Sequence, residues 1–307
     1  MLDVSIIIVN WNGKDLMRRC LDAVIATTRR VSYEVIVVDN ASTDGSQDFL
    51  KQTYPDVRLI ENTDNAGFAG ANNQGMAISE GRYVLLLNSD AFVGEGTIDT
   101  MVQFMDEHPD AGMSACKLLY DDGRLQPSAY AFPSLLTELY TALQLDKVFA
   151  RSREFGKYLM TWWDFDEVRE VDTVMGAFML VRREVVDQVG VMDTSYFMYS
   201  EEFDWCYRIK QQGWTILYNP AVQTVHLWGG SSQRVRVEMF LQLYRSKVTF
   251  FRKHYGVVSA NLLKLILGIG CLLRIGPGMI YYRRSSDPNK REKHRAFQQL
   301  LQALPAF

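Results

Sequence analysis

Short runs of wholly apolar residues alternate with helical stripes through the first 120 residues of this chain. In a stripe, apolar side chains recur every three or four residues, as Leu16, Cys20 and Val24 do. A strand that is apolar throughout is covered on both faces, as in parallel sheets with crossover helices. We therefore expect an α/β fold whose mainly parallel, mixed sheet has helices on both faces. The expected strands are residues 5–9, 34–38, 57–60, 83–87 and 111–116, and the expected helices are 14–28, 45–54, 69–79 and 97–107.

Composition and charge indicate the cellular compartment and the kind of partner. The four cysteines lie far apart, without paired or metal-type spacing, which predicts free thiols in a reducing compartment. The chain opens directly into a strand-like run without a basic leader, so we do not expect a secretory signal. The net charge of −3 hides an asymmetry, because residues 245–307 hold 12 Lys and Arg against 2 Asp and Glu. Such a basic appendage indicates contact with something anionic.

Polar side chains follow the first two expected strands. Asn10, Trp11 and Asn12 come after the first strand, and Asp39 ends the second. In an open α/β sheet, groups at the carboxyl ends of strands face the crevice where ligands bind. Asp39 could accept from a pyrimidine N3–H while Trp11 stacks on the base. The alternative is that these are ordinary turn residues.

A divalent cation is the expected means of neutralising phosphate. Neither a Walker loop nor a G-x-G-x-x-G motif follows the first strand, although Asn65, Gly67 and Asn72 belong to a Gly-rich helix start that could face an anion. Asp90 follows an apolar strand and offers a hard oxygen ligand for Mg²⁺ or Mn²⁺. His226, which precedes a glycine–serine run at 229–232, is a candidate second ligand or phosphate contact.

Three acids stand at the start of an expected helix. Glu201, Glu202 and Asp204 could simply stabilise the helix dipole, by about 0.3–1 kcal/mol each. Three acids within four residues exceed what capping requires, and close carboxylates raise one another's pKa. A carboxylate with a raised pKa suits a general base that accepts a proton from an alcohol.

Together these segments resemble family 2 glycosyltransferases of the GT-A fold. The resemblance is carried, in order, by residues 4–13, 38–46, 65–75, 86–90 and 199–205. It implies inverting transfer of a sugar from a nucleoside diphosphate to a hydroxyl, with Asp39 contacting the base and Asp90 binding metal. The Gly-rich run is most similar to rhamnosyltransferase-like members. Ser89 and Gly176 are expected to line the nucleotide-sugar site, although the segment around Gly176 could equally be a plain buried strand.

Two departures from the family pattern matter. The metal motif is Asn88-Ser89-Asp90, so it keeps one carboxylate. The usual Glu-Asp pair of the family is here Glu201-Glu202. Glu202 matches the base by position, with a side chain one methylene longer, and Asp204 is the fallback assignment.

Beyond residue 118 the sequence pattern changes. We expect a catalytic domain over residues 1–240, with a nucleotide-sugar half of about 1–118 and an acceptor half of about 119–240, and then a helical region over 241–307. Residues 120–170 are aromatic-rich and aperiodic, so they either shape the acceptor site or form a surface excursion. The remaining expected elements are strands at 174–181, 215–218 and 222–226 and helices at 183–189 and 200–212.

The tail combines apolar and cationic segments. Residues 262–282 are apolar, but their longest uncharged piece has nine residues, short of the roughly 20 that span a bilayer. An apolar helix beside clustered cations predicts an interfacial anchor on anionic lipid. The anchor implies a cytoplasmic enzyme, peripheral on the inner face of the plasma membrane, with a glycan or polyprenyl-linked acceptor. The alternative is a helical hairpin packed on the catalytic domain or on a second subunit, as in a homodimer. The cations are Arg283, Arg284, Lys290, Arg291, Lys293 and Arg295.

Two rival functions remain at this point. A nucleotidyltransferase would want a basic Gly-rich loop after the first strand, where only Lys14 stands. A catalytically inactive nucleotide-sugar binding module would keep the same fold. A nucleic-acid role is not expected, because the main domain is acidic and the basic segment lacks interleaved aromatics. The donor nucleotide, dTDP or UDP, is left open.

Overall fold

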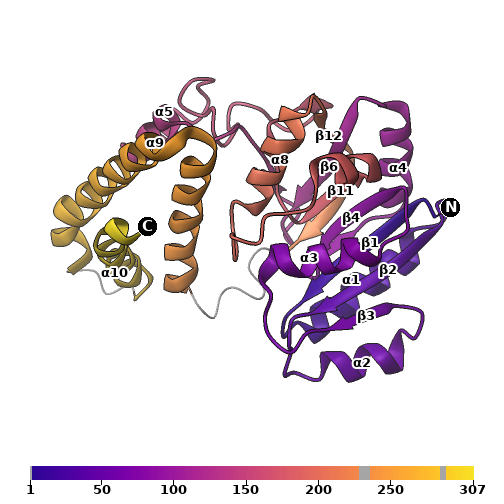
Figure 1. Cartoon of the computed structure of the whole chain (residues 1–307). Coiled ribbons are helices and arrows are strands. Elements are labelled where there is room, and N and C mark those ends of the chain that lie inside the picture. The colour runs from indigo at the N-terminus through magenta and orange to yellow at the C-terminus, as the bar shows by residue number, and fades with distance from the viewer. Residues whose placement is uncertain (1, 228–235, 284–287) are drawn as a thin grey trace. The chain divides into compact units, whose positions relative to one another are not determined.

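The chain divides into two compact units, the sheet unit and the helical unit (Figure 1). The computed structural model describes residues 2–227, 236–283 and 288–307; the 229–232 run and Arg284 lie outside them. The expected acceptor half, about residues 119–240, is therefore divided between the two units. Much of the aperiodic stretch 120–170 lies in the same unit as the C-terminal helices. The sheet unit is Met1–Tyr130, Phe165–Phe197 and Glu201–Gln233, and the helical unit is Ala131–Asp164, Met198–Ser200 and Arg234–Phe307.

One mixed sheet forms the centre of the sheet unit. The strands are β1 (Val4–Asn10), β2 (Tyr33–Asp39), β3 (Arg58–Glu61), β4 (Tyr83–Asn88), β5 (Ala91–Val93), β6 (Ala111–Leu119), β7 (Leu125–Gln126), β9 (Arg169–Glu170), β11 (Phe178–Arg182) and β12 (Thr215–His226). Within the described residues the order is β3-β2-β1-β4-β11-β6-β12-β5, with β7 beside β6 and β9 beside β12. The first four strands pair in parallel, whereas β11 runs antiparallel to both neighbours. A separate short pair joins β8 (Ala129–Tyr130) to β10 (Thr173–Val174).

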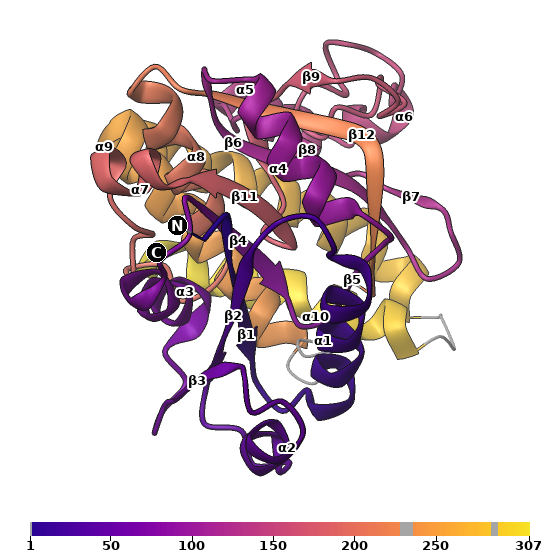
Figure 2. The same ribbon diagram turned by 90° about the vertical axis from the view of Figure 1, so that its right-hand side faces the viewer.

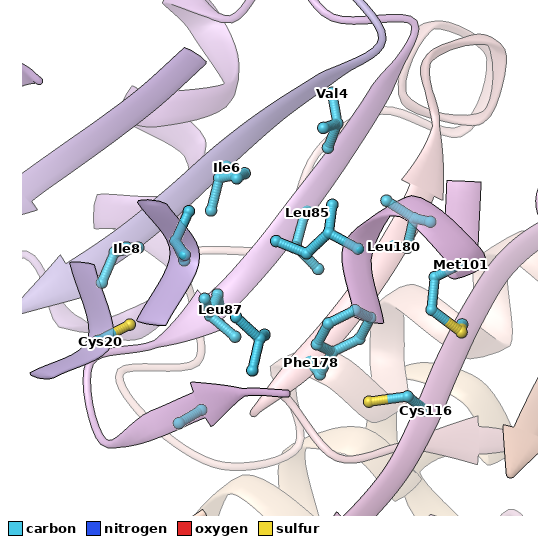
Figure 3. Packing of buried hydrophobic residues seen from close by; sticks show 14 of the residues in the cluster. Val4, Ile6, Ile8, Cys20, Leu85, Leu87, Met101, Cys116, Phe178 and Leu180 are labelled. Atoms are coloured by element: carbon cyan, nitrogen blue, oxygen red, sulfur yellow. The ribbon is translucent and has the colours of Figure 1, made fainter. Parts of the chain in front are cut away.

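Helices cover both faces of this sheet, as the apolar strands predict. Side chains alternate along β1, so Ile6 and Ile8 face α1 (Lys14–Thr27) and α4 (Thr97–Glu107) in the main core (Figures 2 and 3). Ile7 faces the other side, where it contacts α3 (Gly67–Ile78) at Gly75. The sheet unit is completed by α2 (Ser46–Thr53), α7 (Arg183–Val189) and α8 (Glu201–Gln211).

Several elements differ from the sequence-based expectation. The strand expected at 174–181 is broken by a turn at 176–177, where a Cβ on Gly176 would meet the Phe68 ring. The two strands expected at 215–218 and 222–226 are one strand, β12, with an irregular register between Asn219 and Gln223. The three-residue strand β5 carries no periodic signal and was not expected.

The helical unit is built around one long, broken helix. Its elements are α5 (Leu135–Ala142), α6 (Leu145–Val148), α9 (Arg236–Arg283), α10 (Pro288–Ala303) and a final 3₁₀ turn, Leu304–Ala306. Gly256, at φ 85°, divides α9 into two segments. Lys247 on α9 donates to both carboxylate oxygens of Glu138 on α5, at 2.8 and 3.0 Å. Burial alone would lower the pKa of Lys247, but attraction to Glu138 outweighs it and holds that pKa above its ordinary value.

Replacing Gly75 by Ala is expected to destabilise the sheet unit. The added Cβ would lie 2.5 Å from Cγ2 of Ile7, whose backbone is held in the sheet, so α3 must shift. Overpacking of this kind costs about 1–3 kcal/mol, more than the ~1 kcal/mol that Ala gains in helix propensity. Urea denaturation followed by circular dichroism measures the difference. Gly70→Ala is the control, because its Cβ would meet only the Ala66 methyl group, at 3.2 Å. Equal effects of both substitutions would contradict the packing argument.

Candidate active site

Pairing of β5 with the end of β12 brings Asp90 and His226 together. His226 lies opposite Ala91 in this antiparallel pair, and the Leu227 N–H donates to the Asp90 carbonyl at 3.1 Å. Nε2 of His226 therefore approaches Oδ1 of Asp90, at 3.2 Å, and both side chains are nearly buried. These two residues, which the sequence suggested as metal ligands, form one local centre.

Gln126 orients the imidazole from the opposite side. Its Oε1 lies 2.9 Å from Nδ1 of His226, and both residues are buried. A carboxamide oxygen only accepts, so with this amide orientation Nδ1 carries a proton and Nε2 is the ring nitrogen that faces Asp90. The sequence analysis missed Gln126, because a single Gln in an aperiodic segment carries no signal. It is positioned by β7, where it pairs with Leu118 of β6.

The carboxyl ends of β1 and β2 are joined through the buried carboxylate of Asp39. Its Oδ2 accepts from the Asn10 amide at 2.8 Å, and its Oδ1 accepts from the Ser42 N–H at 2.9 Å and from Nε2 of Gln47 at 2.7 Å. Asp39 and Asn10 are both fully buried. Asp39 and Asn10 therefore support the loops at this edge of the sheet from inside the protein. Gln47, which is half-buried, covers the Asp39 carboxylate.

Two loops meet above this carboxylate. Oδ1 of Asn12 accepts from the Thr43 N–H at 2.7 Å, and the Asn12 N–H donates to the Ser42 hydroxyl at 2.8 Å. Asp44 accepts from the Lys14 N–H at 2.9 Å. Burial raises the pKa of Asp44, but hydrogen bonds from Ser46 and from the Lys14 N–H outweigh it and hold that pKa below its ordinary value. Trp11, between these anchored residues, is 37% exposed and available for stacking.

The Gly-rich helix start is built by close backbone contacts. Asn65 is exposed, and its Oδ1 accepts from the Gly67 N–H at 2.9 Å. Gly67 has φ 72°, and a Cβ there would lie 2.5 Å from the Phe197 carbonyl oxygen, so only glycine fits. Asn72 is buried and donates to the Phe68 carbonyl. This places α3 against the segment that precedes α8.

Two further expected residues have plain structural settings. Ser89 is nearly buried in the turn between β4 and β5. Gly176 is half-buried, and a Cβ there would meet the Phe68 ring at 3.1 Å. Gly176 thus lies against Phe68, a residue of the Gly-rich helix start, and its expected place near the donor sugar stays a prediction.

The three acids of α8 have different surroundings. Asp204 is fully buried and pairs with Arg208 at 2.9 Å, and Arg208 also donates to the carbonyls of Val189 and Val191. Burial, and then the charge of Asp204, raise the pKa of Tyr196. Glu201 is nearly buried, whereas Glu202 is only half-buried at the first turn of the helix. Glu202 is thus the acid with the most access to solvent.

The donor set fits a divalent cation that shares its coordination with a ligand. Among the described residues no cluster of three or more His, Cys, Asp and Glu side chains could hold a metal ion. Asp90 and His226 offer one carboxylate oxygen and one imidazole nitrogen. Mg²⁺-type sites are commonly completed by substrate phosphates and water rather than by an all-protein cage. The pair therefore suits a cation that arrives with a diphosphate.

The chain is similar in sequence to known glycosyltransferases. The sequence profile described as "Glycosyl transferase family 2" matches residues 5–190. The N-acetylglucosaminyl-diphospho-decaprenol L-rhamnosyltransferase of Mycobacterium tuberculosis is 33% identical over 225 residues, which cover 70% of this chain and 72% of that relative. The low-salt glycan biosynthesis hexosyltransferase Agl10 of Haloferax volcanii is 24% identical over 251 residues, which cover 79% of this chain and 72% of that relative.

Solved structures support the fold. The mannosyltransferase PcManGT from Pyrobaculum calidifontis, in complex with GDP-Man and Mn²⁺, covers 100% of this chain with a TM-score of 0.59 at 18% identity; the match covers 88% of that protein. The expected GT-A fold with a C-terminal helical region is confirmed at this level. Since the family profile spans more than half of the sequence, the chain belongs to glycosyl transferase family 2 and is a glycosyltransferase.

Proposed function

We propose that this glycosyltransferase moves a sugar, rhamnose in the first instance, from a dTDP- or UDP-linked donor to a hydroxyl of a polyprenyl-linked glycan, with inversion. The observation that carries the proposal is the pairing of Asp90 with His226 at the sheet edge. The sugar and the acceptor class are suggested by the name of the mycobacterial relative, which specifies L-rhamnose and a diphospho-decaprenol carrier.

A divalent cation, Mg²⁺ or Mn²⁺, is proposed at Asp90 and His226. When bound, it would neutralise charge on the departing diphosphate. Gln126 would hold the His226 ring so that Nε2 is presented to the cation, a supporting contact of the kind that metal-ligating histidines commonly have. The structural neighbour with GDP-Man and Mn²⁺ shares the fold, and this supports the same type of site.

Glu202 is proposed as the general base. The acceptor oxygen would attack the anomeric carbon as its proton passes to the Glu202 carboxylate, and the bond from that carbon to the diphosphate oxygen breaks with its electron pair on the diphosphate. Glu202 is favoured because it is half-buried, while Asp204 is fully buried against Arg208. Glu201 and Asp204 would then hold the first turn of α8 in place.

The nucleotide is proposed to bind over the ends of β1 and β2. Gln47 donates to Oδ1 of Asp39 and lies at the half-buried edge, so a base N3–H could replace it at that oxygen. Trp11 would stack on the base, with Asn10 and Asn12 holding the edge beneath it. Asn65, Gly67 and Asn72, at the start of α3, together with Ser89 and Gly176, are proposed to line the rest of the donor site.

A lipid-linked acceptor places the reaction at a membrane. We propose that the protein is cytoplasmic and peripheral on the inner face of the plasma membrane, with a homodimer as the alternative use of its C-terminal helices. The helical unit supports a membrane contact, since it holds 18 Lys and Arg against 7 Asp and Glu, a net charge of +11.

The donor and the metal are tested together by nucleotide release from a panel of dTDP- and UDP-sugars, with Mn²⁺, Mg²⁺ or EDTA. We expect one donor to be turned over, EDTA to abolish turnover, and Asp90→Asn to lower kcat/KM on the order of 10²-fold. Asp122→Asn, an exposed Asp in the β6–β7 turn, is the control. Saturable nucleotide binding without turnover of any donor, lipid-linked acceptor included, would instead indicate a non-catalytic binding module.

Gln126→Leu is expected to weaken Mn²⁺ affinity about 10–100-fold, because the His226 ring loses the acceptor that orients it. Electron paramagnetic resonance of free Mn²⁺ measures this affinity in the presence of nucleoside diphosphate. Gln126→Glu keeps an acceptor oxygen and should retain most of the affinity. Unchanged Mn²⁺ affinity in Gln126→Leu would remove the proposed role of this side chain.

Glu202→Gln is expected to lower kcat by about 10²–10⁴-fold while leaving donor affinity unchanged, because an amide cannot accept the acceptor proton. Glu184→Gln, a first-turn acid of α7, is the matched control for the helix-dipole contribution. Single-turnover transfer and nucleotide titration separate the two quantities. If Glu201→Gln rather than Glu202→Gln abolished transfer, the base would be assigned to Glu201.

A further inference from the structure

The second segment of α9 has one continuous apolar face that the rest of the helical unit leaves exposed. Val258 is 74% exposed, and Leu262 and Leu265 are 45% and 61% exposed. The spacing of these residues repeats every three or four positions, so they share one side of the helix. The full set, here called the α9 face, is Val257, Val258, Leu262, Leu265, Ile269, Leu272 and Leu273.

The opposite side of the same segment is sealed inside the helical unit. Leu263 and Cys271 are buried, and a Cβ on Gly270 would meet Ala142 of α5 at 3.1 Å. Arg274 donates to the carbonyl oxygens of Thr141 and Ala142, both at 2.9 Å, and so satisfies the C-terminal end of α5. One side of this segment is therefore buried in the helical unit, and the other side is exposed to solvent.

We propose that the α9 face lies in the plane of an anionic bilayer surface, with its apolar side chains at the boundary between headgroups and acyl chains. The proposal rests on the proposed function only for the lipid-linked acceptor that gives the contact its purpose. An exposed apolar face on a strongly cationic unit is the pattern of interfacial helices, and the helical unit carries a net charge of +11.

A spanning helix fits the structure less well. By length and composition, the stretch Val237–Gly276 of α9 could cross a membrane, the single such helix in the described part of the chain. Spanning would require the second segment to leave α5, and Arg274 would lose its two carbonyl partners within hydrocarbon. Lying in the plane exposes only the open face to lipid and keeps these contacts.

A second copy of the chain is a weaker candidate than anionic lipid for the partner of the α9 face. Pairing of two α9 faces would bring together two units of net charge +11, whose mutual repulsion opposes association. An anionic lipid surface, in contrast, matches the apolar face and the cations at the same time. Charge therefore favours lipid over self-association.

Flotation of the full chain with phosphatidylcholine vesicles, with and without phosphatidylglycerol, tests the proposal. The protein is expected to float with phosphatidylglycerol vesicles, to be released by high salt or alkaline carbonate, and to bind plain phosphatidylcholine weakly. Serine at Leu262, Leu265 and Leu272 together should lower vesicle binding about tenfold or more. These side chains are exposed, so the variant should fold normally by circular dichroism.

Matched controls separate this surface from general hydrophobicity. Serine at Ile25, Val168 and Val191, which are 47%, 49% and 41% exposed in the sheet unit, should leave vesicle binding unchanged. Gln at Lys253, Lys264 and Lys293 should weaken binding to anionic vesicles and flatten its salt dependence. Donor hydrolysis without vesicles should be unchanged in all three variants. Loss of vesicle binding can therefore be distinguished from loss of enzyme activity.

Three outcomes would overturn the proposal. Vesicle binding by the Leu262, Leu265 and Leu272 variant at the level of the unmodified chain would show that the α9 face is not the contact. Resistance to alkaline carbonate would indicate a spanning helix. A dimer that dissociates in this variant, with no vesicle binding by the unmodified chain, would assign the face to self-association.

Discussion

The short antiparallel pairing between β5 and the end of β12 is the contact on which the candidate site depends. It places His226 beside Asp90, although these residues are separated by most of the sheet unit in sequence. A slip of one residue in this register would turn His226 to the other face of the strand. The Gln223 carbonyl resists such a slip, because it accepts from the Gly94 N–H and from the Thr97 hydroxyl.

The buried carboxylate of Asp39 likewise brings separate elements together at the other end of the candidate site. It gathers donors from β1, from the loop after β2 and from α2, and a buried charge is stable only when it is satisfied in this way. The backbone above it adopts left-handed conformations at Asn12 and Ala41, with φ 52° and 59°. Such conformations cost free energy and persist where neighbouring hydrogen bonds hold them, as the Asn12–Thr43 and Asn12–Ser42 contacts do here.

The parts of the fold that could be predicted from sequence are those with long periodic patterns. The apolar runs of β1, β2 and β4 and the stripe of α1 were placed within a residue or two, since burial on two faces leaves a strong signal. β5 has three residues and Gln126 stands alone, so neither has a period to detect. Their positions follow from pairing with β12 and β6, a tertiary effect that a local pattern does not carry. The break at 176–177 lies within a run that is apolar on both sides of Gly176, so the local pattern does not show it either.

The two units carry net charges of opposite sign, which affects both the proposed donor and the proposed membrane contact. The sheet unit holds 15 Lys and Arg against 29 Asp and Glu, a net charge of −14, yet its proposed donor carries a diphosphate. An acidic unit repels that ligand over long range, so neutralisation by the cation proposed at Asp90 and His226 matters more than it would in a basic unit. The same acidity disfavours contact between the sheet unit and an anionic bilayer. The proposed contact through the oppositely charged helical unit avoids this repulsion.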